Sequence, residues 1–413
     1  MPTPPLRILI VDDEPDRSRD WAAKIDAFGF PGATVTALDI EAARVVMRAA
    51  DSRRRRARDK ADPFSADAPC DLDTVDILIV DYDLQELLAV GEWSTGLQVA
   101  TLARALTRVK LIVLVNQFGT NAFDLTLSKA AQSHADFDVG SGQLLNPALW
   151  DRSRVDGYAP WAWSDGILRA PARMEATLQW LMPRLNDPVL TTLGFTSTVV
   201  DTSNAETYLA KELWQECLDD PNHSFRQLVS ESEFLTLKDR LAIAAFDEPC
   251  ARVAAALVSH WLDRWVIPAN EVLIDLPHLA SSYPWLLAKK EELGCWQQAT
   301  SLYGGFDALL AGVRKHEFAP GFPLARPVVW KRKVVQDVDL AEPNGFTYDG
   351  FPDLVFCEDT SSFHEFADAR PFSCRLPGSD SQRFVANPDK VEPTSGGQPL
   401  TDVDYEPSVF FSV

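Results

Sequence analysis

The strongest constraint on the fold is an apolar run near the N-terminus that ends in two adjacent carboxylates. Residues 6–11 read Leu-Arg-Ile-Leu-Ile-Val, Asp12 and Asp13 follow, and Pro15 then starts a helical pattern. Residues 75–81 repeat the arrangement and end in Asp81. Such runs are typical of parallel strands that are buried on both faces. Because parallel strands end at one edge of a sheet, the three acids are expected to form a pocket suited to a hard cation.

The first 150 residues alternate between strand and helix patterns, which predicts an α/β domain with a parallel five-stranded sheet. The expected strand order is flavodoxin-like, with the switch point beside the first strand. The predicted strands are residues 6–11, 33–38, 75–81, 109–115 and 135–139, and the predicted helices are 15–28, 40–50, 97–106 and 122–133.

Residues 5–148 resemble the receiver domain of bacterial two-component response regulators, on the acidic pair at 12–13 and the third acid at 81. The resemblance implies that Asp12 and Asp13 hold Mg²⁺ and that Asp81 accepts a phosphoryl group. It further implies that Asp81 and the main-chain carbonyl of Asp83 are metal ligands.

The sequence departs from this family at two positions that contact the phosphoryl group. Asn116 ends the fourth strand where the family has Ser or Thr, and residues 138–143 contain no lysine. Without that lysine, the charge of about −1.5 to −2 on a phosphoryl group would lie beside the acids with less positive charge to balance it. We favour a pseudo-receiver that serves protein interaction. A working but atypical phospho-receiver and an acidic edge without function are the alternatives.

The overall charge argues against binding to nucleic acid or to a membrane surface. The net charge is −21 and the sequence pI is about 4.7, which repels phosphate backbones and anionic lipid. The arginine-rich run at 53–58 is interpreted as a loop or a helix extension that pairs with acids. The six cysteines have no C-x-x-C spacing, and no apolar run approaches the roughly 20 residues of a membrane span. These features predict a cytoplasmic protein with reduced thiols.

The sequence of the remaining two thirds of the chain supports fewer structural predictions. Residues 149–195 read as a Trp-rich connector, in which Trp161 and Trp163 are assigned to packing. Residues 196–317 read as a mainly helical domain in which Asp247 caps a helix. Residues 318–413 read as a β-rich region with strands at 327–335, 354–357 and 408–413, and the basic residues 331–333 are expected on an exposed strand.

We therefore expect a bacterial signalling protein that is more a binding protein than an enzyme. Its receiver-like domain would control the interaction of a C-terminal region that does not bind DNA with a protein partner. A histidine kinase would be a partner if Asp81 is phosphorylated. The alternative is an enzyme in residues 190–413, regulated by the receiver-like domain, in a bacterial conflict or defence system. It would need a cluster among His278, His316, His364 and nearby acids, whereas Asp275 and His278 alone are explained by a turn.

Overall fold

The computed structural model describes residues 6–85, 95–116, 134–151, 166–196, 217, 219–232, 242–287, 292–300, 308–349, 351–372 and 383–386. Its N-terminal part is a parallel sheet of five strands in the order β2-β1-β3-β4-β5, which confirms the predicted flavodoxin-like architecture. The strands are β1 (Leu6–Val11), β2 (Ala33–Ala37), β3 (Ile77–Asp81), β4 (Leu111–Asn116) and β5 (Phe137–Gly140).

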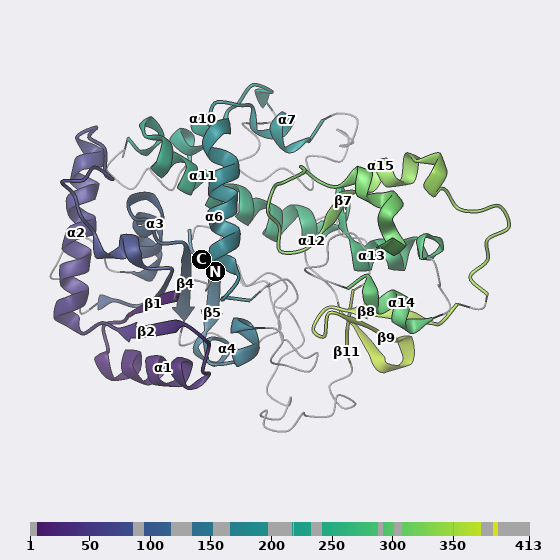
Figure 1. Cartoon of the computed structure of the whole chain (residues 1–413), viewed down its shortest axis with the longest axis horizontal. Coiled ribbons are helices and arrows are strands. Elements are labelled where there is room, and N and C mark those ends of the chain that lie inside the picture. Colours follow the sequence, from purple (N-terminus) through teal and green to yellow (C-terminus); the bar gives the residue numbers. More distant parts are fainter. Residues whose placement is uncertain are drawn as a thin grey trace.

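Helices cover both faces of this sheet (Figure 1). One face carries α1 (Pro15–Ala27), α4 (Ser141–Leu144) and α5 (Pro147–Trp150), and the other carries α2 (Ile40–Arg58) and α3 (Gly96–Leu106). Because side chains alternate along a strand, β3 contributes to both cores. Ile77 and Ile79 pack on the α1 side, and Leu78 and Val80 pack on the α2 side.

The middle of the chain is mainly helical, as predicted. The core on the α2 side of the sheet continues without interruption into this helical part. Polar contacts also cross this junction: Arg108 pairs with Glu248 at 2.7 Å, and Arg252 donates to the carbonyl of Val109. The helices are α6 (Ala170–Leu181), α7 (Val189–Leu193), α10 (Phe225–Glu231), α11 (Asp247–Trp261), α12 (Ile267–Ala269), α13 (Leu276–Ser282), α14 (Leu293–Gln298) and α15 (Lys331–Gln336).

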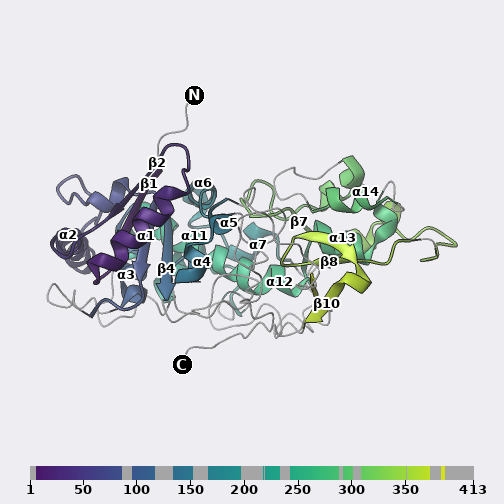
Figure 2. The ribbon, with the colours of Figure 1, turned by 90° about the horizontal axis from the view of Figure 1, so that it is seen from below.

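A small β-rich part follows at the other end of the long axis, which both ribbon views show (Figure 1, Figure 2). It has a four-stranded sheet in the order β10-β11-β8-β9, and a separate pair β6-β7. This confirms the β-rich C-terminal region. The strands are β6 (Leu273–Asp275), β7 (Val328–Trp330), β8 (Leu354–Cys357), β9 (Ser362–Glu365), β10 (Ala369–Phe372) and β11 (Arg383–Ala386).

Two local predictions were wrong. Residues 331–333 begin α15 instead of continuing a strand, because the pairing of β7 with the three residues of β6 ends at Trp330. Asp247 is the first residue of α11 and does not cap it; its carboxylate pairs with Arg226. The predicted segments 122–133 and 408–413, with Trp161 and Trp163, lie outside the described residues.

The arginine-rich run is the end of α2, and it pairs with acids as expected. Arg53 is buried and forms two hydrogen bonds with the Asp73 carboxylate. Arg55 pairs with Asp51, and Arg56 with Asp67. These residues therefore contribute to local structure. Among the helices described, none has both the length and the apolar composition required to cross a membrane.

Candidate functional site

The carboxyl ends of β1 and β3 bring together the three acids that the sequence singled out. The two strands are parallel neighbours with Val11 opposite Val80, so Asp12 follows one strand beside Asp81 on the other. Asp12, Asp13 and Asp81 are all buried, and their oxygens lie within 4.8 Å of one another. The structure thus forms the predicted acidic cluster.

A cation from the chain itself lies in this cluster. Arg17 is in the first turn of α1, and its Nε donates to Oδ2 of Asp12 at 2.6 Å. One terminal nitrogen of the same guanidinium donates to Oδ1 of Asp12 at 2.7 Å and to Oδ2 of Asp81 at 2.8 Å. It is also 3.7 Å from Asp13. A single planar group therefore joins both strand ends.

Burial and the neighbouring charges change the acid strength of Asp81. Burial, and after it the Asp12 carboxylate, raises the pKa of Asp81 to about 7, although Arg17 acts in the opposite direction. The hydrogen bond with Asp12 raises the pKa of Arg17, so the guanidinium stays charged. Asp81 Oδ1 is buried without a hydrogen-bond partner in the described part of the chain. Near neutral pH, the cluster therefore changes charge by one proton.

The other predicted site residues lie around this edge. Asn116 ends β4 opposite Gly140 of β5, and its side chain is exposed. The backbone of Asp83 lowers the pKa of Asp81, against the larger effects of burial and Asp12. A Cβ on Gly96 would lie only 2.2 Å from the Asp81 carbonyl oxygen, so glycine is needed where α3 starts.

The donor set suits a hard divalent cation in type, because carboxylate oxygens are the ligands that Mg²⁺ takes. The space between the acids is nevertheless occupied. Arg17 hydrogen bonds both oxygens of Asp12 and one of Asp81, so a metal ion between these carboxylates would require the guanidinium to move. With Arg17 in place, the residues do not fit a resident Mg²⁺.

A second group of buried charges lies between the helical part and the C-terminal sheet. His278 of α13 contacts Asp275 through Nδ1 and Glu358 through Nε2, the latter at 2.9 Å. Arg326 pairs with Asp275, and Arg383 pairs with Glu358 and donates to the carbonyl of Pro268. We call these five side chains (Asp275, His278, Arg326, Glu358 and Arg383) the His278 network.

Nδ1 of His278 faces the Asp275 carboxylate, and Nε2 lies 2.9 Å from Oε1 of Glu358 and 3.1 Å from a guanidinium nitrogen of Arg383. Burial lowers the pKa of His278, but the carboxylates of Asp275 and Glu358 outweigh it and the net shift is upward. Burial raises the pKa of Glu358, but Arg383 and His278 outweigh it and bring the value to about 2. The carboxylates and the basic groups of the network therefore favour each other's charged forms.

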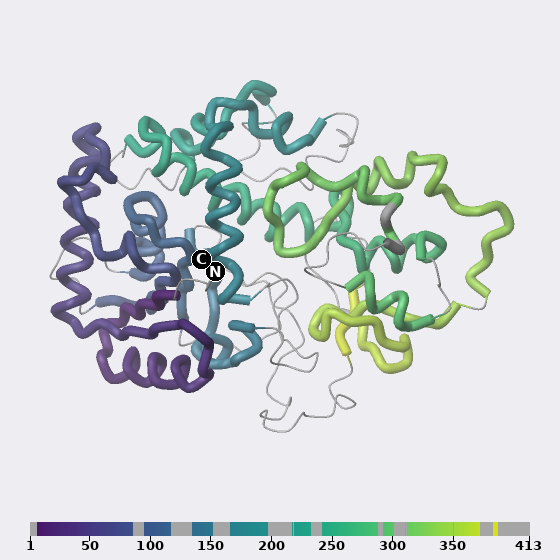
Figure 3. Tube along the Cα trace, in the orientation of Figure 1, coloured from purple at the N-terminus to yellow at the C-terminus, as the bar shows by residue number. Residues whose placement is uncertain are grey.

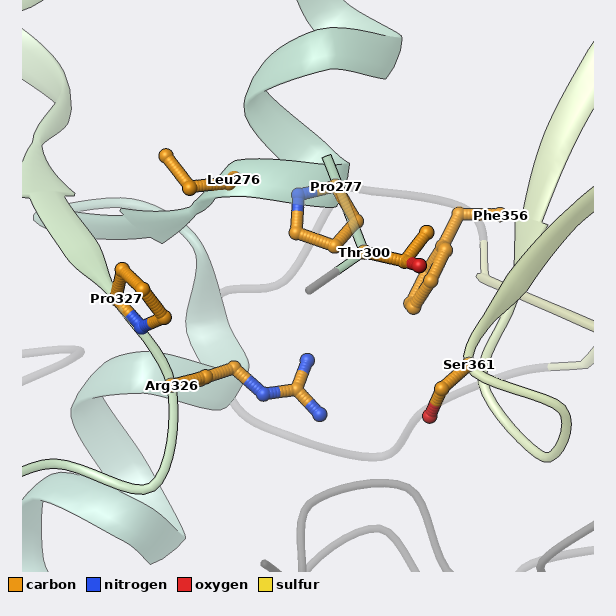
Figure 4. A pocket seen from close by; sticks show the side chains of 7 residues that line it. All are labelled: Leu276, Pro277, Thr300, Arg326, Pro327, Phe356 and Ser361. Carbon is orange, nitrogen blue, oxygen red and sulfur yellow. The ribbon is translucent and has the colours of Figure 1, made fainter. Parts of the chain in front are cut away.

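A small pocket adjoins this network. Arg326 lines it together with the hydroxyl-bearing Thr300 and Ser361, and Pro277 and Phe356 form apolar walls (Figure 4). Ser361 has a positive φ of 49° in the turn between β8 and β9. The acidic cluster lies at the sheet edge and has no part in this pocket.

The histidine cluster that an enzyme in residues 190–413 would need does not form through the contacts of the described residues. His278 belongs to the network above, whereas His316 pairs with Asp337. His364 contacts the hydroxyls of Thr360 and Ser362. The three histidines thus have three separate sets of partners.

Sequence reasoning missed two features of these sites. The compensating cation was expected after β5, whereas Arg17 lies in the first turn of the helix that follows Asp12 and Asp13. Asp275 and His278 were also assigned to a turn. Asp275 does cap α13, but both side chains also join the network, whose other members lie far away in the sequence.

Comparison with known proteins adds no identification: no protein-family model, no curated protein and no solved structure matches this chain.

Proposed function

We propose that this chain is a signalling protein of the response-regulator kind whose N-terminal domain is a pseudo-receiver. In this proposal the domain keeps the acidic edge of a receiver but occupies it with Arg17, and it serves protein–protein interaction. The observation that supports this best is the single guanidinium that contacts Asp12 and Asp81. A phosphoryl group on Asp81, and a metal beside it, would both need the space of that guanidinium.

The protonation of Asp81 supports the same interpretation. A carboxylate attacks a phosphoryl donor in its ionised form, and burial with Asp12 raises the pKa of Asp81 to about 7. At neutral pH a substantial fraction of Asp81 is therefore protonated, and the ionised fraction is hydrogen bonded to Arg17. Both effects oppose nucleophilic attack by Asp81.

The domain would act as part of the whole chain. Its α2-side core is continuous with α6 and α11, and the Arg108–Glu248 pair crosses the same junction. A partner would therefore recognise the assembled protein, whose interaction surface the C-terminal region shares. The pathway would be bacterial signalling, with the C-terminal region as the output that does not bind DNA.

The enzyme alternative has less support. The histidine with the strongest carboxylate contacts, His278, has both ring nitrogens engaged, which leaves none to exchange a proton with a substrate.

The test is the intact mass of the full chain after incubation with acetyl phosphate and Mg²⁺, with an ordinary receiver labelled in parallel. The proposal predicts no phosphoryl adduct on the natural sequence. An adduct that is present on the natural sequence and absent from Asp81→Ala would overturn it. That outcome would make the chain an atypical phospho-receiver and its partner a histidine kinase.

A further inference from the structure

An exposed segment between α15 and β8 carries aromatic rings and acids at the far end of the molecule from the parallel sheet. We call residues 337–349 and 351–353 the acidic arm. Its trace projects outward at the right of the view in the tube drawing (Figure 3). Apart from one short 3₁₀ turn at Val338–Leu340, it contains no helix or strand.

Five aromatic rings form a continuous surface on and beside this arm. Trp285 contacts Tyr283 at 5.4 Å and Phe346 at 5.2 Å between ring centroids. Phe346 in turn contacts Tyr348 at 5.3 Å and Phe351 at 5.2 Å. None of the five is fully buried, and Tyr348 is 63% exposed. Tyr348 is exposed and the other four rings are partly exposed, and contiguous apolar surface of this kind marks interaction sites more often than isolated residues do.

The arm has a fixed base. The Trp285 indole donates to the carbonyl of Leu340 at 3.0 Å. Asp337 pairs with Lys315 at 2.6 Å and with His316 at 2.8 Å. The aromatic surface is therefore presented by an anchored segment, which reduces the entropy that binding would cost.

The charge on this surface has one sign. Residues 337–353 contain five acids and no lysine or arginine. Glu342, Asp349 and Asp353 are exposed, and none forms an ion pair with another described residue. The basic residues of the neighbouring α15 are partly engaged, since Lys331 pairs with Glu271 and Lys333 lies over the Trp330 ring.

We propose that the acidic arm is a docking surface for an arginine-rich segment of a partner protein. A guanidinium is planar, stacks on aromatic faces and pairs with carboxylates, so it matches both features of the arm. A second copy of this chain is disfavoured by the net charge of −21 and the repulsion that it causes. The chain's own residues 387–413 carry five acids and one lysine, so their charge does not complement the arm. The inference does not depend on the pseudo-receiver proposal.

The experiment measures binding of a fluorescent peptide of alternating Arg and Gly to the full chain by anisotropy. Tyr348→Ala is expected to weaken binding roughly fivefold to tenfold through loss of the ring. Replacement of Arg by Lys in the peptide is also expected to weaken its binding to the natural chain. The double change Glu342→Lys and Asp349→Lys is expected to weaken it by roughly tenfold or more.

The matched control for charge is Asp26→Lys with Asp71→Lys, two exposed acids of the N-terminal domain. This control is expected to leave binding within about twofold, because charges beyond a Debye length of about 8 Å are screened at physiological salt. Equal losses in both charge variants would show general attraction to an acidic protein and would overturn the proposal. Unchanged binding in Tyr348→Ala would also overturn it. So would self-association of the chain that Tyr348→Ala abolishes, since the occupant would then be a second copy.

Discussion

The acidic cluster around Asp81 and the His278 network both bury carboxylates, and both contain arginine. In the cluster, three acids face one guanidinium that comes from the adjacent first turn of α1. In the network, two acids face two arginines and a histidine from elements up to 105 residues apart. The cluster therefore keeps an excess of negative charge and a raised pKa at Asp81, whereas the carboxylates of the network have lowered pKa values. The first arrangement can respond to a cation or a proton, and the second holds two parts of the chain together.

The largest effect is expected from breaking the network. Arg383→Ala would leave the buried Glu358 without its guanidinium partner, and removal of one partner of a buried ion pair costs about 3–5 kcal/mol. Chemical denaturation of the full chain would measure the loss. Arg332→Ala, at an exposed position of α15, is the control and should change the free energy of unfolding by less than about 0.5 kcal/mol. Equal effects of the two changes would contradict a structural role for the network.

The pH dependence of stability should differ in sign between the two regions. The folded pKa of Asp81, about 7, is above its unfolded value of about 3.9. The folded state therefore binds more protons between these values, and Asp81 lowers stability as pH rises through this window. Asp81→Asn should stabilise the chain by about 1–3 kcal/mol at pH 8 and by less near pH 5. Thermal unfolding from pH 5 to pH 8 measures this.

Glu358→Gln is the opposite case. The pKa of Glu358 in the folded chain, about 2, is below its unfolded value of about 4.3. Glu358 therefore stabilises the folded chain fully above a pH of about 4.3, and this stabilisation is lost as the pH falls toward 2. Its removal should therefore destabilise the chain at neutral pH. The difference in sign between the two regions would be contradicted if Glu358→Gln stabilised the chain at neutral pH. It would also be contradicted if Asp81→Asn changed the stability equally at pH 5 and pH 8.

Arg17→Ala should have an intermediate effect that Mg²⁺ reverses. Without the guanidinium, the two buried acids lose charged hydrogen bonds worth about 1–3 kcal/mol. In metal-free buffer the variant should unfold more readily, and Mg²⁺ should restore stability by binding the folded state. Arg383→Ala serves as the comparison, because Mg²⁺ should not rescue it. Failure of Mg²⁺ to stabilise Arg17→Ala would mean that the cluster is not a latent cation site.

The smallest effect is expected at the surface end of α2. Arg56 pairs with the exposed Asp67, and exposed pairs contribute about 0–1 kcal/mol. Arg56→Ala should therefore change stability little, whereas Arg53→Ala, which breaks a buried pair with Asp73, should cost more. Denaturation of both variants under the same conditions compares them directly.

How far the sequence predicted these regions depends on how local their contacts are. The acidic cluster could be predicted because two apolar runs end in acids and parallel neighbours bring those ends together. The same reasoning could have identified Arg17, because it lies in the first turn of the helix that starts directly after these acids. The His278 network was not, because Glu358 and Arg383 reach His278 only through the pairing of β8 with β11. Residues 331–335 were misassigned because Val334 and Val335 favour a strand, whereas the pairing of β7 with β6 ends at Trp330.

The most direct test of the central claim is a calorimetric titration of Mg²⁺ into the natural chain and into Arg17→Ala at pH 8. If Arg17 is the cation of the acidic cluster, Arg17→Ala should bind Mg²⁺ at least roughly tenfold more tightly, since the metal no longer displaces a charged group. The further change Asp81→Asn in the Arg17→Ala background should abolish that gain. Equal and tight binding by the natural chain and Arg17→Ala would contradict the claim and would restore the interpretation of a metal-dependent receiver.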